Sequence, residues 1–366
     1  METSELLVKL RKKIDLVDFE IIKLINQRME HSLRTRRLKQ NILDPDREQE
    51  VMTAIRRHSR GLIKPEFSSR LFNEIISESK RLQGQHLKLV GFQGEHGAYG
   101  EVAIRNIDPA LVPIPCPEFV DVFDEVLNGQ LDYGLVPVEN SLEGAVTQVN
   151  DLLVEADVSK IRIVGEIRIT IRHCLLALPG ADPCEIKVVY SHPQALAQCR
   201  QFLHGRRLEP RPYYDTAGAA MMLSNERPRT AAAIASKLCA ELYNLQVLFE
   251  NIEDNKLNTT RFLLLSKEEN KEAGNKCSII FSTEHKAGSL FAVLKLFSDA
   301  GLNLTRIESR PIRNDPGKYA FLLDFLGSSR DQKVIDTIEK VKKETVVFKF
   351  LGCYQEALLP SSAGDF

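Results

Sequence analysis

The N-terminal part of the sequence contains a long stretch, Glu5 to Leu43, without a proline or a glycine. Apolar residues recur within it at alternating steps of four and three: Leu10, Ile14, Val17, Ile21 and Leu24. This spacing is typical of a helix with a coiled-coil seam. At about 1.5 Å per residue such a helix would be roughly 60 Å long, which is too long for one small domain to bury. The sequence therefore predicts a helix that packs along a second chain, in a dimer of interlocked helices.

The seam of this predicted helix continues to a basic residue, Arg28, and two further cations, Arg11 and Lys39, lie one step beside it. A guanidinium on an apolar stripe is costly unless an anion pairs with it. Residues 1–85 also carry more basic than acidic side chains, although the formal net charge of the whole chain is −1. We therefore expect this segment to bind an anion.

Two more helices are expected before residue 85. Asp44 or Asp46 suits an N-cap position, and Pro45 suits the first turn of the helix that follows. A later helix is predicted from Phe67 to Gln83, with its apolar residues on one face. The first 85 residues thus read as an all-helical domain.

The composition is that of an ordinary globular protein. The 366 residues are enough for two or three domains, and 43% are hydrophobic and 27% charged. No apolar run approaches the roughly 20 residues that span a membrane, and the N-terminus lacks the basic start of a signal peptide, so we expect a cytoplasmic protein. The 7 cysteines form no C-x-x-C pair. We therefore expect reduced, mostly buried thiols and no metal.

After Gln83, Gly84 and Gln85 the sequence changes to short strands that alternate with helices. Polar residues stand at the ends of the predicted strands: Glu139 and Asn140 after Tyr133–Val138, Glu166 after a strand, Ser191 after Lys187–Tyr190, and Thr259, Thr260 and Arg261 before Phe262–Leu265. The run Phe262–Leu265 is typical of a buried strand of the parallel type. Pro193 suits a first helical position, which would put Ser191 and Gln198 near a helix start. Because ligands of open α/β sheets bind at strand ends, these polar residues predict a cleft.

The last part of the chain follows a polar linker, Lys267 to Lys276. Its predicted elements are listed in chain order: strand Cys277–Ser282, helix Ser289–Ala300, strand Leu304–Ile312, strand Tyr319–Phe325, helix Asp331–Val341 and strand Thr345–Leu351. This order is that of a ferredoxin-like α+β unit. Fold alone does not define what such a unit does.

Within residues 5 to 84, one set of polar residues has the spacing of a known domain: Arg11, Arg28, Lys39, Asp44, Arg47, Glu48, Ser79 and Gln83. The segment resembles the all-helical chorismate mutase domain. By this resemblance, Arg28 and the partner subunit's Arg11 would bind the two carboxylates of chorismate. Lys39 and Gln83 would contact the ether oxygen, and Glu48 would hold the ring hydroxyl.

The same resemblance implies that Asp44 and Arg47 assist at the ring hydroxyl and that Ser79 helps to hold a carboxylate. These residue types suit a Claisen rearrangement, which needs no nucleophile or general base. It needs a dianion held in a compact conformation, with donors aimed at an oxygen that gains negative charge. No cofactor is implied.

Residues 87 to 267 resemble prephenate dehydratase. The resemblance rests on motifs in the same order: a glycine-rich turn, Val136 to Ser141, Tyr190 to Gln194 with Gln198 and Cys199, and Thr259 to Phe262. It implies two α/β lobes with a cleft between them and a last strand that returns into the first lobe. Asn140, Ser191, Gln198 and Thr260 would line the cleft, and Glu139, Glu166 and Arg261 would lie close by.

Prephenate loses its ring hydroxyl as water and its ring carboxylate as carbon dioxide, so the enzyme needs a proton donor at the hydroxyl. Thr260 is the family's candidate donor. Because a threonine hydroxyl is a very weak acid, we interpret it as a hydrogen-bond donor or relay, with Glu139 or His192 as the proton source behind it. The turn Gly97 to Gly100 lacks the hydroxyls that relatives carry there, so its polar contacts must come from the backbone.

Residues 277 to 355 resemble the phenylalanine-sensing ACT domain of these enzymes. The residues that carry the resemblance are Gly288, Ser289, Leu290, Phe291, Glu308, Ser309, Arg310 and Pro311. Apart from Phe291, which replaces a valine of the family motif, they are expected to bind the effector. The resemblance implies that L-phenylalanine binds between two such units and inhibits the enzyme.

We therefore expect a multidomain chain: an all-α mutase domain in an intertwined dimer (1–85), a two-lobed α/β dehydratase domain (87–267), an α+β ferredoxin-like ACT domain (277–355) and a tail (356–366). Its partners would be chorismate, prephenate, L-phenylalanine and further copies of itself, with no nucleic acid and no membrane. One alternative is arogenate dehydratase activity in the central domain. Another is a DNA-binding regulator. Two observations argue against it: Arg28 lies on the seam, and no helix-turn-helix spacing appears.

Overall fold

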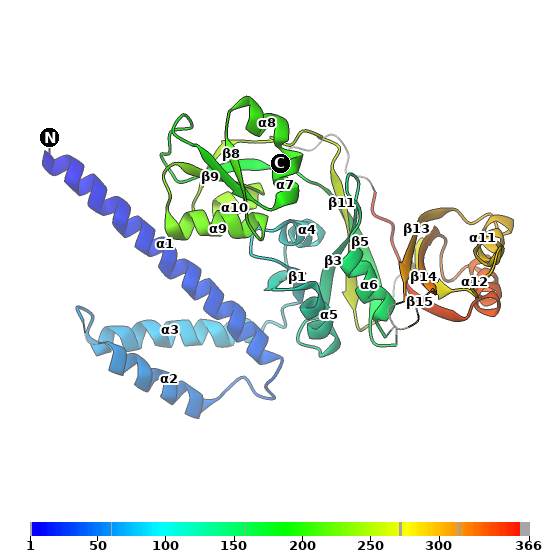
Figure 1. Ribbon diagram of the computed structural model, residues 1–366. Coiled ribbons are helices and arrows are strands. Elements are labelled where there is room, and N and C mark those ends of the chain that lie inside the picture. Colours follow the sequence, from blue (N-terminus) through cyan, green and yellow to red (C-terminus); the bar gives the residue numbers. More distant parts are fainter. Residues whose placement is uncertain are drawn as a thin grey trace. The chain divides into compact units, whose positions relative to one another are not determined.

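The computed structural model of the chain (Figure 1) describes residues 2–59, 61–157, 159–270, 273–312, 315 and 317–358. The chain forms two compact units, one up to Lys88 and one from Leu89 onward. Most of the predicted tail, from residue 359, lies outside the described residues. No helix among the described residues is long and apolar enough to cross a membrane.

The first unit contains three helices, α1 (Glu2–Arg36), α2 (Pro45–His58) and α3 (Pro65–Gln83). The Asp44 side chain accepts a hydrogen bond from the Arg47 amide and caps α2, which confirms the predicted restart at Pro45. The prediction that the first helix continues to Leu43 is wrong. Beyond Arg36 the backbone changes to bonds three residues apart, and the Arg36 guanidinium bonds the Lys39 carbonyl, which turns the chain out of the helix.

The apolar seam of α1 is not covered by α2 and α3. Met29 and Leu33 near its C-terminal end are buried with Ile75 and Ile76 of α3. The seam residues before them are each 47% to 59% exposed: Leu10, Ile14, Val17, Ile21 and Leu24. Only the last turns of α1 therefore contribute to the core of their own unit.

The second unit begins with a lobe built on a sheet of strand order β2-β1-β3-β11-β5, with β4 attached to β3. Its strands are β1 (Leu89–Gln93), β2 (Val112–Cys116), β3 (Tyr133–Asn140), β4 (Gly144–Ala145), β5 (Arg162–Thr170) and β11 (Thr259–Ser266). Its helices are α4 (Tyr99–Ile107), α5 (Phe119–Leu127) and α6 (Thr147–Glu155). The strand β11 joins this sheet after the chain has built the other lobe, so the two predicted lobes are confirmed.

The second lobe has the strand order β10-β6-β9-β7-β8. Its strands are β6 (Cys174–Ala177), β7 (Val188–Ser191), β8 (Glu209–Pro212), β9 (Ala231–Ala235) and β10 (Gln246–Phe249). Its helices are α7 (Pro193–Gln198), α8 (Arg200–Gly205), α9 (Thr216–Glu226) and α10 (Lys237–Leu242). Pro193 begins α7, as predicted.

Strand β11 differs from its prediction in direction. It pairs antiparallel with both β3 and β5, although its apolar run is typical of a parallel sheet. The chain re-enters the first lobe from the second, and therefore runs against the strand that leads out. Its apolar run is explained by burial on both faces, which is what that pattern records.

The ACT domain forms an antiparallel sheet of order β13-β14-β12-β15, the predicted ferredoxin-like arrangement. Its elements are β12 (Lys276–Ser282), α11 (Ser289–Asp299), β13 (Leu304–Pro311), β14 (Tyr319–Leu326), α12 (Gln332–Glu344) and β15 (Val347–Tyr354). Cys277, Ile279 and Phe281 of β12 pack with the helices. Lys276 and Ser278, which alternate with them, are also fully buried. Lys276 donates to Glu166 of the first lobe, and Ser278 donates to Asp324 of β14. This sheet is therefore buried on both faces at β12.

Candidate active sites

A cavity of about 410 Å³ lies between the two lobes of the second unit. The first lobe contributes Gln93, Tyr99, Pro137, Asn140, Thr260 and Phe262, and the second contributes His173, His192, Gln198, Tyr214 and Asp215. A volume of this size suits a small organic molecule. Three of the residues predicted to line a cleft, Asn140, Gln198 and Thr260, lie in its wall.

The Thr260 hydroxyl is held by a fixed amide. The Asn140 side-chain oxygen accepts bonds from the backbone amides of Leu142, at 2.9 Å, and Glu143, at 3.1 Å, which orients the amide group. The Asn140 NH₂ group then donates to Thr260 Oγ1 at 2.9 Å and to Asn258 Oδ1 at 2.8 Å. Within the described part of the chain, the Thr260 hydroxyl hydrogen has no acceptor, so it is available to a ligand in the cavity.

Gln198 continues this network across the cavity wall. Its Oε1 accepts a bond from Asn258 at 3.1 Å and lies 2.9 Å from His173 Nε2. Burial lowers the pKa of His173 and outweighs the bond to Gln198, so the ring is neutral at pH 7. Nε2 then carries the hydrogen and donates to Gln198, and Nδ1 lies 2.8 Å from the Tyr99 hydroxyl, which donates to the Arg172 carbonyl at 2.7 Å. The wall around Thr260 is therefore lined by neutral hydrogen-bonding groups.

Ser191 does not line this cavity, contrary to expectation. Its hydroxyl is fully buried and donates to the Ile234 carbonyl at 2.6 Å. Ser191 is the last residue of β7, so its side chain still follows the alternation of the strand and points into the core of the second lobe. It anchors β7 to β9 beneath the start of α7.

Arg261 and Glu166 do not line the cavity, although Arg261 follows Thr260 directly in β11. Glu166 lies within β5 and not after it, and its Oε2 accepts a bond from Arg261 Nε at 2.6 Å. Because strand side chains alternate, Arg261 points away from the face that carries Thr260. Glu139 points the same way and lines a separate hollow of about 330 Å³ with Arg168 and the ACT domain. Of the two proposed proton sources, only His192 lines the cavity.

Several cavity residues were not found by sequence reasoning, among them Asp215, Tyr214 and Tyr99. The Asp215 carboxylate accepts from the Gly218 amide at 2.8 Å and caps α9. Burial raises the pKa of Asp215 above its ordinary value despite the amide bonds that lower it. An aspartate before a helix is a common capping signal, and nothing in the sequence marks this one as belonging to a cleft.

In the helical unit, α1 and α3 bring three predicted residues together. Arg28 Nη1 donates to Ser79 Oγ at 2.6 Å. One turn further along both helices, Gln83 Nε2 donates to the carbonyl and hydroxyl oxygens of Ser32, at 2.7 and 2.8 Å. Burial lowers the pKa of Arg28 from a very high ordinary value, so it remains a cation. Within the described residues this guanidinium pairs with no carboxylate.

The other predicted residues of this unit divide into two groups. Lys39 lies 3.5 Å from Asp44, and Glu48 pairs with Lys80 of α3 at 3.0 Å, so these side chains stand at the same end of the helices. Arg47 is exposed and pairs with Glu50 of its own helix. Arg11 is exposed and lies about 25 Å from Arg28 along the axis of α1. Arg11 therefore cannot join Arg28 within one chain.

The predicted effector residues lie on α11 and β13. Gly288 precedes α11 with a φ of 87°, a conformation that favours glycine. The Ser289 hydroxyl is buried without a hydrogen-bond partner in the described part of the chain. On β13, Ser309 pairs with Phe321 on the helix-covered face, whereas Arg310 on the opposite face binds Asp151 of α6 at 2.6 Å. The three other predicted effector residues occupy the same two elements: Leu290, Glu308 and Pro311.

Family models match the chain in three successive segments: chorismate mutase type II over residues 10–84, prephenate dehydratase over 90–270 and the ACT domain over 278–343. A bifunctional chorismate mutase/prephenate dehydratase of Pseudomonas aeruginosa is 36% identical, over 98% of this chain and 100% of that protein. An arogenate dehydratase/prephenate dehydratase of Arabidopsis thaliana is also 36% identical, but over 80% of this chain and 78% of that protein.

Among solved structures, a prephenate dehydratase from Arthrobacter aurescens in complex with L-Phe is 32% identical, with a TM-score of 0.68. It covers 73% of this chain and 90% of its own length. The Pseudomonas enzyme accounts for all three segments in their observed order. The chain thus belongs to the family of bifunctional chorismate mutase/prephenate dehydratases with an ACT domain, enzymes of phenylalanine biosynthesis.

Proposed function

We propose that prephenate binds in the cavity between the two lobes and that Thr260 donates a hydrogen bond to its ring hydroxyl as that group leaves. The observation that carries this proposal is the Asn140 amide, which occupies the acceptor side of Thr260 Oγ1 and leaves its hydrogen for the ligand. His192 lines the same cavity, and its Nδ1 accepts from the Gln194 amide at 3.3 Å. In this neutral form Nε2 of His192 carries a hydrogen and can donate a hydrogen bond to a ligand. The proposed proton source behind Thr260 is His192 after its ring has taken up a second proton.

The neutral hydrogen-bonding groups around Thr260 suit this reaction. The substrate must release a carboxylate as carbon dioxide, and strong charge pairing with that carboxylate would stabilise the ground state more than the transition state. Asn140, Gln198 and neutral His173 can orient the substrate without such pairing. The change that drives the reaction is the aromatisation of the ring.

We propose that chorismate binds in the helical unit, on Arg28, Lys39, Glu48, Ser79 and Gln83. Arg28 supports this proposal because it donates to a neutral hydroxyl and its positive charge has no carboxylate partner among the described residues. A bound substrate carboxylate would supply the negative charge that pairs with Arg28. Asp44 caps α2, the helix that carries Glu48, and thereby supports the position of Glu48. This role needs no contact between Asp44 and the substrate.

We propose that the helical unit forms a homodimer. The exposed seam of α1 would be covered by a second copy, and the partner subunit's Arg11 would reach the site around Arg28. Higher assemblies through the ACT domain are compatible with this arrangement. A cytoplasmic location, where thiols stay reduced, is part of the same proposal.

Mixing two inactive variants tests this shared site. Arg11→Ala and Arg28→Ala should each lose mutase activity, because each removes one carboxylate partner. After unfolding and refolding together, half of the dimers should be hybrids, and each hybrid should contain one intact site. The mixture should therefore recover about a quarter of wild-type activity. No recovery would mean that Arg11 of the partner subunit does not complete the site around Arg28.

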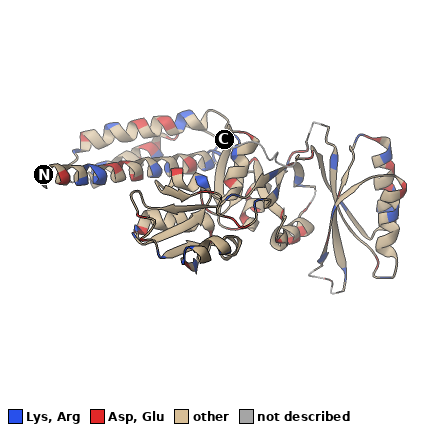
Figure 2. Cartoon of the chain, turned by 90° about the horizontal axis from the view of Figure 1, so that it is seen from above, with Lys and Arg blue, Asp and Glu red and all other residues tan. Residues whose placement is uncertain are grey.

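We propose that L-phenylalanine binds to the ACT domain and inhibits the dehydratase. The relative from Arthrobacter aurescens binds L-Phe, and the unpaired Ser289 hydroxyl beside Gly288 is a polar group for an amino acid to meet. The departure Gly-Ser-Leu-Phe from the family motif leaves the effector preference to experiment. In the view of Figure 2, Lys and Arg are interspersed with Asp and Glu along the helical unit, so this view gives no support to a nucleic-acid partner.

One assay tests both activities and the effector. Purified protein should convert chorismate to phenylpyruvate, and added phenylalanine should lower phenylpyruvate formation while chorismate continues to disappear. Accumulation of prephenate without phenylpyruvate would contradict the dehydratase proposal. Arogenate would then be supplied in its place, and its conversion to phenylalanine would establish the alternative substrate.

A further inference from the structure

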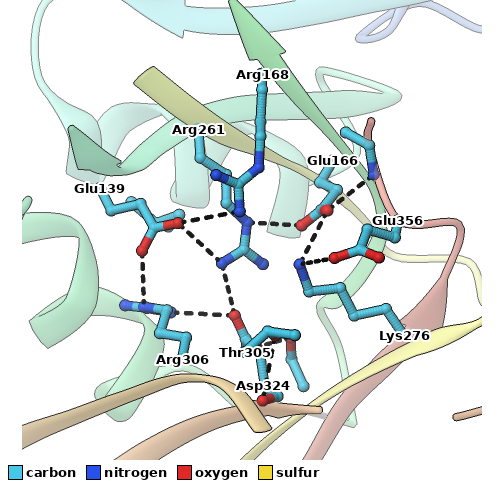
Figure 3. A network of polar contacts seen from close by, with 12 residues as sticks. Glu139, Glu166, Arg168, Arg261, Lys276, Thr305, Arg306, Asp324 and Glu356 are labelled. Atoms are coloured by element: carbon cyan, nitrogen blue, oxygen red, sulfur yellow. Dashed lines mark hydrogen bonds and ion pairs between the residues drawn. The ribbon is translucent and has the colours of Figure 1, made fainter. Parts of the chain in front are cut away.

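A buried network of charges joins the dehydratase lobe to the ACT domain (Figure 3). It contains as many cations as carboxylates: Arg168, Arg261, Lys276 and Arg306 with Glu139, Glu166, Asp324 and Glu356. Three ion pairs cross from one domain to the other: Arg261 to Asp324 at 2.7 Å, Lys276 to Glu166 at 3.1 Å and Arg306 to Glu139 at 4.0 Å. Each domain therefore contributes partners to charges that the other domain buries.

Arg261 stands at the centre of this network and is 1% exposed. Its guanidinium donates to Glu166 of the dehydratase lobe at 2.6 Å and to Asp324 of β14 at 2.7 Å. It also donates to the Tyr354 hydroxyl of β15 at 3.1 Å. Tyr354 in turn shares a hydrogen bond with Ser278 of β12, which donates to Asp324 at 2.6 Å. The three ACT strands β12, β14 and β15 thus hold one dehydratase side chain.

The neighbouring charges keep Arg261 and Asp324 ionised. Burial acts to lower the pKa of Arg261, but Asp324, Tyr354 and Glu166 outweigh it and raise that pKa. Burial acts to raise the pKa of Asp324, but Arg261 and Arg306 hold it below its ordinary value. Separation of the domains would take Asp324 and Tyr354 away from Arg261 and would take Glu166 away from Lys276, which is unfavourable for ions buried to this extent. The position of the ACT sheet is therefore coupled to that of the Arg261 side chain.

Strand β11 connects this cluster directly to the cavity. Thr260 and Phe262 line the cavity, and Arg261 between them points to the ACT domain. The pairing of β11 with β3 shifts its register between Arg261 and Phe262, a local irregularity of the kind that re-aims side chains. Consecutive Cα atoms are a fixed distance of about 3.8 Å apart, so a displaced Arg261 also moves Thr260.

The strand that carries predicted effector residues is tied to the same cluster. Arg306 of β13 lies 3.8 Å from Asp324 and also bonds Asn150 of α6. Four residues further along the same strand, Arg310 binds Asp151 of α6 at 2.6 Å. A movement of β13 would therefore act on Asp324, the ACT partner of Arg261.

We propose that Arg261 is a positioning residue for Thr260: the ACT sheet holds its guanidinium and thereby sets the place of the Thr260 hydroxyl in the dehydratase cavity. The inference rests on the proposed role of that cavity in prephenate dehydration. It makes Arg261 the route by which effector binding at the ACT domain reaches the reacting atoms. Asp324, Tyr354 and Ser278 would act through Arg261 and make no contact with substrate.

The test uses Arg261→Lys and Tyr354→Phe in the full-length protein, with Arg211→Gln as the matched control. Arg211 is an exposed arginine of β8 that pairs with Glu209, so its loss removes an ion pair away from the cavity. Arg261→Lys keeps the charge but cannot reproduce the forked bonds to Glu166, Asp324 and Tyr354. Tyr354→Phe removes a single hydroxyl from the ACT side of the cluster.

Arg261→Lys should lower kcat for prephenate by about tenfold to a hundredfold with KM changed less than about threefold, because the donor is misplaced while the cavity remains. Tyr354→Phe should raise the phenylalanine concentration for half-inhibition several-fold, while equilibrium dialysis shows phenylalanine binding as before. Arg211→Gln should behave as wild type. Mutase activity on chorismate checks the helical unit, and the melting temperature and far-UV circular dichroism check that the dehydratase and ACT domains of each variant are folded.

Variants that lower the melting temperature but keep wild-type kcat and wild-type phenylalanine response would overturn the inference, because the cluster would then be only structural. Failure of the underlying proposal has a different signature, since the wild-type protein itself would not convert prephenate. If Arg261→Lys fails to fold, Tyr354→Phe alone decides: an unchanged half-inhibition concentration rejects the coupling.

Discussion

Thr260→Val should lower kcat for prephenate by roughly 10²- to 10⁴-fold and leave the conversion of chorismate to prephenate unchanged. Valine has nearly the shape of threonine, so the cavity keeps its volume, but the group that donates to the departing hydroxyl is gone. The measurement is steady-state formation of phenylpyruvate from prephenate, alongside mutase activity in the same preparation. Prephenate should accumulate when this variant is given chorismate.

Two neighbouring substitutions make this result specific. Thr260→Ser keeps a hydroxyl on the same side of β11 and should retain much of the activity. Thr259→Val removes a hydroxyl from the adjacent residue, which lines the hollow on the ACT side and not the cavity. It should therefore remain near wild type. Comparable losses in Thr259→Val and Thr260→Val would contradict a direct role for Thr260.

Arg28→Gln should lower the mutase rate by about 10³-fold and leave dehydration of added prephenate unchanged. Glutamine can still bond Ser79, but it carries no charge for a substrate carboxylate, and the Claisen rearrangement depends on holding a dianion in its compact conformation. The measurement is the disappearance of chorismate, with phenylpyruvate formation from prephenate followed separately. Arg28→Lys should recover only part of the rate, because an ammonium cannot reproduce the guanidinium fork.

The control for Arg28 is Arg81→Gln in the same unit. Arg81 is exposed and pairs with Glu78 on its own helix, so its loss should leave both activities intact. Retention of most mutase activity in Arg28→Gln would place the substrate elsewhere. Together with Thr260→Val, this variant should separate the two reactions, each change removing one and sparing the other.

Sequence reasoning predicted the types of most elements because their patterns are local. The absence of proline and glycine, together with apolar residues at steps of three and four, predicted the helix α1. The pair Asp44 and Pro45 predicted the start of α2 at the residue where it begins. The alternation of strands and helices after residue 277 produced the ferredoxin-like sheet. Asn140, Gln198 and Thr260 were found from polar residues at element ends, and they do meet in one cavity.

The errors concern direction and facing, which are not local properties. The sequence places Thr260 and Arg261 next to each other on a strand, and neighbouring side chains of a strand point to opposite faces. Only the packing of the two lobes and the ACT sheet decides which of these faces borders the cleft. The prediction that Ser191 lines the cleft did not hold for the same reason, since its hydroxyl donates to the Ile234 carbonyl of β9. The antiparallel course of β11 depends on where the chain re-enters the first lobe.

By itself, then, the sequence determined the three-part organisation, the helical and strand segments and the chemistry of the residues that meet in the cavity, because periodicity and side-chain type act over a few residues. Only the tertiary structure decided that Arg261 and Glu166 turn away from the cavity between the lobes and into a charge cluster with Asp324. The partners of a buried ion come from segments far apart in the chain, and burial without those partners is too costly to occur.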